Sequence, residues 1–177
     1  MGQGDQDRRG EAGLSALPPF RAIGDIVREA ATTRPQHIAL VQGERRLACG
    51  ELDALADRVA AALQRDGVQP TQAIAISGAN SIEYAVLFLG GLRAGTAVAP
   101  LPTGATPQQL AGMVADSGAR LLFADASVPP LEVGVPRIAM DASEEHTSLG
   151  AWPAPPGARP ADVPVQPQWP SNIIYSS

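Results

Sequence analysis

Apolar residues recur at helical spacing in four stretches of the chain. From Leu52 to Leu63 they fall at positions i, i+3, i+4 and i+7, which predicts an amphipathic helix. The same spacing predicts three more helices, which we place at 23–34, 80–95 and 106–118. Each of these segments ends at or next to a proline or a glycine, residue types that commonly end helices.

Short apolar runs lie between the predicted helices. They occupy residues 38–41, 73–76, 97–99 and 121–124, and residues 45–48 are placed to return as the hairpin partner of the first run. Apolar runs without alternation are typical of parallel strands that are buried on both faces. Strands that alternate with helices favour right-handed strand–helix–strand units. We therefore expect an α/β fold with a mainly parallel sheet and flanking helices.

Two of the predicted helices have recognisable starts. Thr106, Pro107 and Gln109 supply an N-cap acceptor, a proline at the first helical position and a glutamine at the third, which is the clearest local signal in the sequence. Asn80 followed by Glu83 is a similar pattern, so we expect Asn80 to cap the third helix.

The sequence divides into four regions by composition. Residues 1–19 are polar and predict a disordered N-terminal arm, and residues 20–125 form the α/β subdomain. Residues 126–170 hold 10 of the 17 prolines and predict a long connection with little regular structure. Residues 171–177 turn apolar again, as in a strand cut off at its tip.

Composition and charge exclude several classes of function. The 177 residues have a formal net charge of −5, and all 13 basic residues are arginines, so we expect no nucleic-acid partner. Cys49 is the only cysteine, and His37 and His146 are the only histidines, too few for a disulfide or a zinc site of their own. No apolar run reaches the length of about 18 residues that spans a membrane. The polar start predicts a cytoplasmic protein without a secretory signal.

Four stretches, in order, carry a resemblance to a known family. They are Ala31–Leu40, Leu47–Leu52, Leu92–Leu101 and Ile173–Ser177, and the third, L-R-A-G-T-A-V-A-P-L, is the most specific. They resemble the N-terminal part of adenylate-forming enzymes, which include acyl-CoA synthetases, luciferases and the adenylation domains of peptide synthetases. The resemblance covers about residues 20–177 and implies the N-terminal domain of that fold, incomplete in this chain.

The last stretch resembles the strand and first residues of the family's phosphate loop, Y-[TS]-S-G-[TS]-T-G-x-P-K-G. The resemblance therefore implies that Ser176 and Ser177 contact the phosphates of ATP, whereas the loop's glycines and lysine do not occur here. It also implies a parent enzyme that uses ATP and Mg²⁺ to convert a carboxylic acid into an acyl adenylate and then a CoA thioester. We expect a fragment that is inactive without the remainder of the enzyme chain and supplies no catalytic residue.

Branches of the family differ in the thiol that accepts the acyl group. Pro100-Leu101-Pro102, followed by Thr106 to Leu110, resembles the acyl-CoA branch more than the P-I-D of peptide synthetases. Gly104 stands where some relatives have a basic residue that could meet the CoA phosphate, so no CoA contact is assigned. Two alternatives stay open, namely an adenylation domain that loads a carrier protein and a non-catalytic α/β binding module.

Several conspicuous residues are expected to have structural roles. Glu51 follows a predicted helix start, where the helix dipole favours an acid, and Cys49 is expected to be half-buried and inert. Tyr175 is interpreted as a core residue of the last strand. Trp152 and Trp169 flank prolines, and we expect them to pin the Pro-rich connection to the core.

Overall fold

The computed structural model describes residues 19–140 and 150–175. The elements in chain order are α1 (Ile23–Thr33), β1 (Ile38–Gln42), β2 (Arg45–Ala48), α2 (Cys49–Arg65), β3 (Ala73–Ser77), α3 (Ile82–Arg93), β4 (Ala97–Leu101), α4 (Pro107–Asp116), β5 (Ala119–Ala124) and β6 (Arg137–Ala139). The helices and strands expected between residues 23 and 124 are present. The strand expected over 171–177 is wrong for its described part, where only Asn172 forms an isolated parallel bridge, to Val98. β6, inside the Pro-rich connection, was not expected. The arm expected over 1–19 lies almost entirely outside the described residues, as does His146.

The strands form two sheets. The larger has the order β4-β3-β5-β6 with every pair parallel, and the smaller is the antiparallel hairpin of β1 and β2. The α/β fold with a mainly parallel sheet and flanking helices is therefore confirmed. β3 is the centre of the sheet, paired with β4 on one edge and with β5 on the other.

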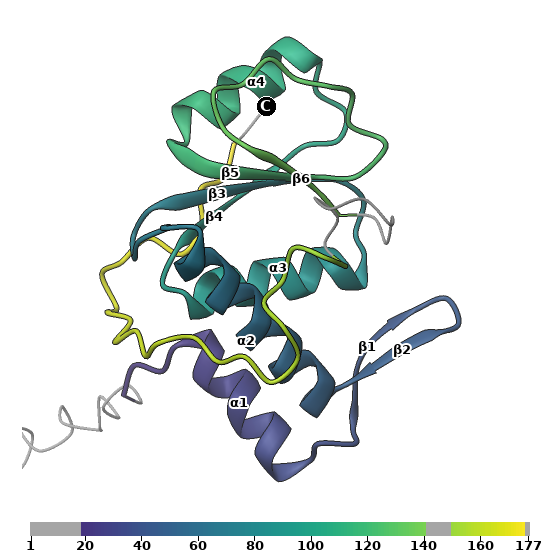
Figure 1. Cartoon of the computed structure of the whole chain (residues 1–177), viewed down its shortest axis with the longest axis vertical. Coiled ribbons are helices and arrows are strands. Elements are labelled where there is room, and N and C mark those ends of the chain that lie inside the picture. Colours follow the sequence, from purple (N-terminus) through teal and green to yellow (C-terminus); the bar gives the residue numbers. More distant parts are fainter. Residues whose placement is uncertain (1–18, 141–149, 176–177) are drawn as a thin grey trace, which may run out of the picture.

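Helices cover both faces of the larger sheet (Figure 1). On one face Ile74, Ile76 and Phe123 share a hydrophobic cluster with residues of α2 and α3. On the other face Ala75 and Leu122 cluster with the apolar residues of α4. α1 lies outside α2 and α3, farther from the sheet. Within the described residues, no helix combines the length and hydrophobicity needed to cross a membrane.

The helix starts confirm one sequence prediction and correct another. Thr106 caps α4 as expected, since its hydroxyl accepts from the Gln109 backbone and the Gln109 side chain accepts from the Thr106 N–H. The expectation that Asn80 caps α3 is wrong. The cap is Ser81, whose hydroxyl accepts a hydrogen bond from the Tyr84 N–H at 3.1 Å. Ser81 has the extended backbone that a cap needs and stands directly before Ile82.

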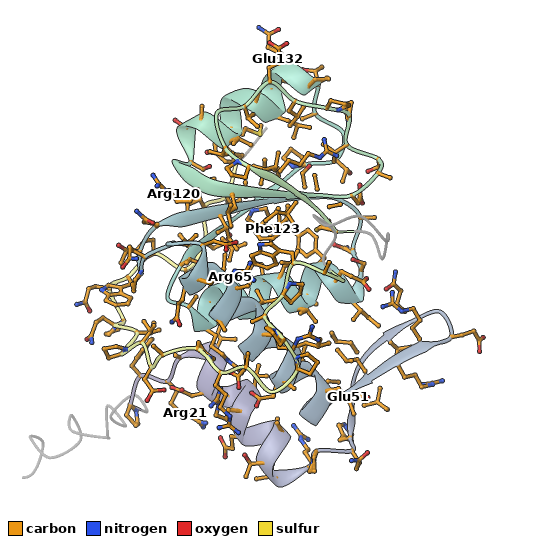
Figure 2. The ribbon with its side chains drawn as sticks, viewed as in Figure 1. Arg21, Glu51, Arg65, Arg120, Phe123 and Glu132 are labelled. Carbon is orange, nitrogen blue, oxygen red and sulfur yellow. The ribbon has the colours of Figure 1, made fainter. Side chains whose placement is uncertain are left out.

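Trp152 fixes the Pro-rich connection to the α2–α3 face of the sheet. Its buried indole meets the Phe123 ring edge to face, with centroids 4.8 Å apart. Its Nε1 donates to Asp66 Oδ2 at 2.8 Å. Arg65, near Phe123 in Figure 2, donates to the Trp152 carbonyl oxygen at 3.2 Å. The packing role expected for Trp152 is confirmed, and Trp169 likewise packs beside Gly95.

Arg93 of α3 links this helix to α1 and α2, which lie on the same side of the larger sheet (Figure 1). Its guanidinium donates to Asp53 Oδ1 at 2.6 Å and to Asp57 Oδ1 at 2.8 Å, both on α2, and to the Gly24 carbonyl oxygen of α1. Arg28 of α1 donates to the same Asp57 oxygen at 2.5 Å. The Arg93 and Asp57 side chains are each only 7% exposed. Arg93 is the last residue of α3, so the network ties the carboxyl end of this helix to α1 and α2.

Gly90 sets the distance between α2 and α3. A Cβ at this position would lie 2.5 Å from Val59 Cβ and 3.2 Å from the Ala56 carbonyl oxygen. We expect Gly90→Ala to reduce the free energy of unfolding by about 1–3 kcal/mol, because neither helix can move without disturbing the core. The matched control is Gly112→Ala in α4, where a Cβ meets no atom within 4 Å. It should stabilise the chain by about 0.4–1 kcal/mol. Urea unfolding measures both, and a neutral Gly90→Ala contradicts the close approach.

Removing the Arg93 guanidinium leaves two carboxylates of α2 without this partner. We expect Arg93→Met, which keeps most of the stem, to lower the free energy of unfolding by about 3–5 kcal/mol. The control is Arg46→Met on the exposed surface of the β1–β2 hairpin, which should change stability by less than about 0.5 kcal/mol. Equal unfolding midpoints for the two variants would show that the network contributes nothing.

Candidate functional site

The carboxyl ends of the parallel strands meet at one edge of the sheet. In open α/β sheets ligands bind outside this edge. The edge is bordered by residues 78–81 after β3, residues 102–106 after β4 and Asp125 after β5. A cavity of about 560 Å³ lies at the opposite edge, between α4 and residues 132–136, and it does not reach these loops. We therefore define the candidate site by the hydrogen-bonding groups at the carboxyl edge and by the strand order, and not by this cavity.

The segment 171–175 approaches this edge alongside β4. Val98 N–H donates to the Ser171 carbonyl oxygen at 3.1 Å, and Ile173 N–H donates to the Val98 carbonyl oxygen at 2.9 Å. The bridge is parallel, so the chain runs toward the carboxyl end of the sheet as it approaches Ser176. Ser176 and Ser177 themselves lie outside the described residues, and their contact with phosphate stays a prediction.

Tyr175 has a more specific environment than the core position expected from the sequence. Its ring is half-buried, and its hydroxyl lies 2.9 Å from Asp116 Oδ2 and 3.0 Å from the Met113 carbonyl oxygen. Both partners belong to the last turn and a half of α4. The last described residue of the chain is therefore tied to the helix on the second face of the sheet.

Asp125 organises the loops that follow β3 and β5. Its Oδ2 accepts from the Ala79 N–H at 2.6 Å, and its Oδ1 accepts from the Ser127 N–H at 2.9 Å and from the Ser127 hydroxyl at 2.5 Å. Burial raises the pKa of Asp125, but these hydrogen bonds outweigh burial and hold the pKa below its ordinary value. Gly78 allows the approach, because a Cβ there would lie 2.6 Å from Asp125 Oδ2.

Sequence reasoning missed both Asp125 and the partners of Tyr175. Asp125 directly follows a buried apolar run and precedes Ser127 by two residues, a spacing typical of an Asx turn. That signal could have found the turn, though not the bond to Ala79. The remaining sequence candidates are structural. Cys49 is buried at the start of α2, and Glu51 accepts a hydrogen bond from the Ala48 N–H at 2.8 Å.

Comparison with known proteins decides the family. A family model described as "AMP-binding enzyme" matches residues 27–177. The chain belongs to this AMP-binding enzyme family. The strand and helix order described above is the order of the N-terminal domain of adenylate-forming enzymes, so the resemblance drawn from the four sequence motifs is confirmed.

Curated relatives of this AMP-binding chain include large peptide synthetases. It is 30% identical over 169 residues to the dimodular nonribosomal peptide synthase of Bacillus subtilis, covering 93% of this chain and 7% of that protein. It is also 30% identical over 153 residues to gramicidin S synthase 2 of Brevibacillus brevis, covering 86% of this chain and 3% of that one. The chain therefore spans less than a tenth of the length of either relative.

Solved structures share the fold at lower identity. The N-terminal domain of FACL13 from Mycobacterium tuberculosis superposes with a TM-score of 0.74 at 24% identity, covering 89% of this chain and 42% of that one. The NpsA N-terminal subdomain of Klebsiella oxytoca, in complex with 3-hydroxyanthranilyl-AMSN, gives a TM-score of 0.76 at 19% identity. That match covers 93% of this chain and 40% of the other. At these identities the likeness shows the fold alone.

The resemblance described in the sequence analysis leads us to expect that the parent enzyme uses ATP with Mg²⁺. The described residues do not fit a resident metal, since residues 19–140 and 150–175 contain no group of three or more His, Cys, Asp or Glu that could hold one. Both Asp125 oxygens already accept hydrogen bonds from the protein. No step through Mg²⁺ is therefore assigned to these residues.

The hydrogen bonds of Asp125 predict a pH-dependent contribution to stability. Its lowered pKa means that this contribution is present above about pH 4 and is lost as the pH falls through the lowered folded-state value. Asp125→Asn should cost about 1 kcal/mol near neutral pH, because an amide cannot accept on both sides. It should also flatten the acid limb of the stability curve. Urea unfolding near pH 7 and near pH 3 checks this, with the exposed Asp162→Asn as control. Parallel acid limbs for wild type and Asp125→Asn would contradict it.

Proposed function

We propose that this chain is the N-terminal part of an enzyme that activates a carboxylic acid with ATP and passes the acyl group to a thiol. The family match over residues 27–177 carries the proposal. It is supported by the segment 171–175, which runs toward the carboxyl edge of the sheet just before the sequence that resembles a phosphate loop. The other motifs lie within the scaffold that holds this segment.

The chemistry proposed for the parent is a displacement at phosphorus. The carboxylate oxygen attacks the α-phosphorus of ATP, the bond to the bridging oxygen breaks, and pyrophosphate leaves with the electron pair. Negative charge grows on the phosphate oxygens, so donors fixed in advance stabilise the transition state. The hydroxyls of Ser176 and Ser177 are proposed as two such donors. The described residues contribute by positioning these serines and not by bond making.

We propose the thiol of CoA as the acceptor. The residues after β4 support it, because Pro100-Leu101-Pro102 and the Thr106–Leu110 segment resemble acyl-CoA synthetases. A carrier-protein thiol is the second candidate. It is favoured by the relatives named above, which are peptide synthetases at 30% identity. The two candidates share the adenylation step and differ only in the acceptor.

The adenylation step is tested by ATP–pyrophosphate exchange with a panel of carboxylic acids, using the enzyme that contains this chain. We expect acid-dependent exchange, reduced about 10-fold or more in Ser177→Ala, because a hydrogen bond to a charged phosphate is lost. Ser171→Ala is the matched control, since Ser171 is exposed and lies in the same segment. The 177-residue chain alone should form no acyl hydroxamate with ATP and hydroxylamine.

The outcomes separate the candidates. No exchange with any acid contradicts the proposed function and favours a binding module. Exchange followed by thioester formation with free CoA supports the first acceptor. Exchange with acyl transfer only to a phosphopantetheinylated carrier protein supports the second and contradicts CoA.

A further inference from the structure

We propose that Asp116, the last residue of α4, is a positioning residue for the phosphate loop and acts through Tyr175. The inference rests on the proposed function, because it takes Ser176 and Ser177 as the start of that loop. It adds to that function a residue of α4, the helix on the second face of the sheet, that fixes the position of the loop. Nothing in the sequence connects the two residues, which the fold alone brings together.

The contact joins two separate parts of the fold. The Tyr175 hydroxyl lies 2.9 Å from Asp116 Oδ2 and 3.0 Å from the Met113 carbonyl oxygen. A phenol has a single proton to donate. The ionised carboxylate is the stronger of the two acceptors, so Asp116 is the principal partner and Met113 a weaker second one.

Tyr175 is the last side-chain anchor described before Ser176. The backbone bonds to β4 end at Ile173, and Ile174 is 77% exposed and contributes little packing. Beyond Ile173, Tyr175 holds the chain, because its side chain packs against the hydrophobic cluster on the α4 face and its hydroxyl contacts Asp116. Since Tyr175 is covalently bonded to Ser176, a shift of the ring moves the start of the loop directly.

The stability of α4 does not explain an acid at position 116. The carboxyl end of a helix carries partial negative charge, so an aspartate there is unfavourable. The last turn of α4 contains no basic residue to offset it. Helix termination is already provided by Gly118, whose φ of +63° is the left-handed conformation that glycine favours. An exposed acid that weakens its own helix, and that contacts Tyr175, fits a positioning role.

The electrostatics of the pair agree with this geometry. Burial raises the pKa of Tyr175, and the hydrogen bond to Asp116 and the negative charge of Asp116 raise it further. The phenol therefore keeps its proton through the neutral pH range. It therefore remains a hydrogen-bond donor at the neutral pH at which the proposed enzyme would work.

The test compares Tyr175→Phe, Asp116→Ala and the double variant in the enzyme that contains this chain. ATP–pyrophosphate exchange gives kcat and KM for ATP, and thermal melting gives stability. We expect Tyr175→Phe to raise KM for ATP roughly fivefold, the loss of about one hydrogen bond. Asp116→Ala should raise it less, because the Met113 carbonyl oxygen remains. The double variant should match Tyr175→Phe, since the two residues act as one unit.

Asp116→Ala should raise KM for ATP without lowering the thermal stability of the protein. Asp116→Ala removes the unfavourable acid from the helix end, so its melting temperature should equal or exceed that of the wild type. Glu44→Ala is the matched control, an exposed acid at the turn of the β1–β2 hairpin, and should leave KM for ATP unchanged. The difference in phenolate absorbance between each enzyme and its Tyr175→Phe counterpart should show a lower pKa for Tyr175 when Asp116 is alanine.

Four results would count against the inference. A wild-type KM for ATP in Asp116→Ala, with an active enzyme, refutes the positioning role and leaves the proposed function intact. Additive effects in the double variant refute action through Tyr175. A Tyr175 pKa that does not respond to Asp116→Ala refutes the contact. Absence of exchange in the wild type with every acid refutes the proposed function itself, and with it this inference.

Discussion

The burial of β3 is the constraint on which the rest of the structure depends. All five of its residues are buried, and the strand is hydrogen-bonded to β4 on one edge and to β5 on the other. A strand with no exposed face or edge needs two partner strands and two layers of helices. The helices α2 and α3 on one side and α4 on the other meet that need (Figure 1). The carboxyl end of β3 is thereby fixed, and the loop that follows it is held against Asp125.

The two helical layers are attached in different ways. The α2–α3 layer is locked by close packing at Gly90, by the buried ions around Arg93 and by Trp152 of the Pro-rich connection. The α4 layer rests on smaller side chains, such as Ala75 and Ala99, and has a smaller cluster. It gains a further link from Tyr175. The segment that precedes the proposed phosphate loop thus contacts the layer with the smaller hydrophobic cluster.

The sequence predicted what depends on local periodicity and missed what depends on distant partners. The Leu52–Leu63 spacing and the Thr106 cap are local, and both identified their helices correctly. Asn80 and Ser81 are neighbouring cap formers, and only the backbone conformation of Ser81 distinguishes them. β6 is three residues long, too short for a periodic pattern to appear.

The candidate site was predicted less well than the fold for the same reason. The final motif predicts a phosphate loop after Tyr175, which stays a prediction. The contact of Tyr175 with Asp116 has no signal in the sequence, because Asp116 lies on another element. Asp125 had a local signal in the following Ser127, yet its bond to Ala79 exists only because β3 and β5 are neighbours in the sheet. Long-range hydrogen bonds of this kind follow from strand order, which a linear pattern does not contain.

The most specific of the four motifs shows why the sequence identifies the family more readily than the molecule that accepts the acyl group. In Leu92–Leu101 several positions have a mechanical task. Leu92 is in the core, and Arg93 carries the ion network. Gly95 adopts a φ of +73° and lies against Trp169 and Val163. These residues hold the scaffold together, a task that does not depend on which thiol receives the acyl group in the proposed reaction. Scaffold residues such as these therefore identify the family, whereas a preference for CoA or a carrier protein depends on the residues that contact the acceptor.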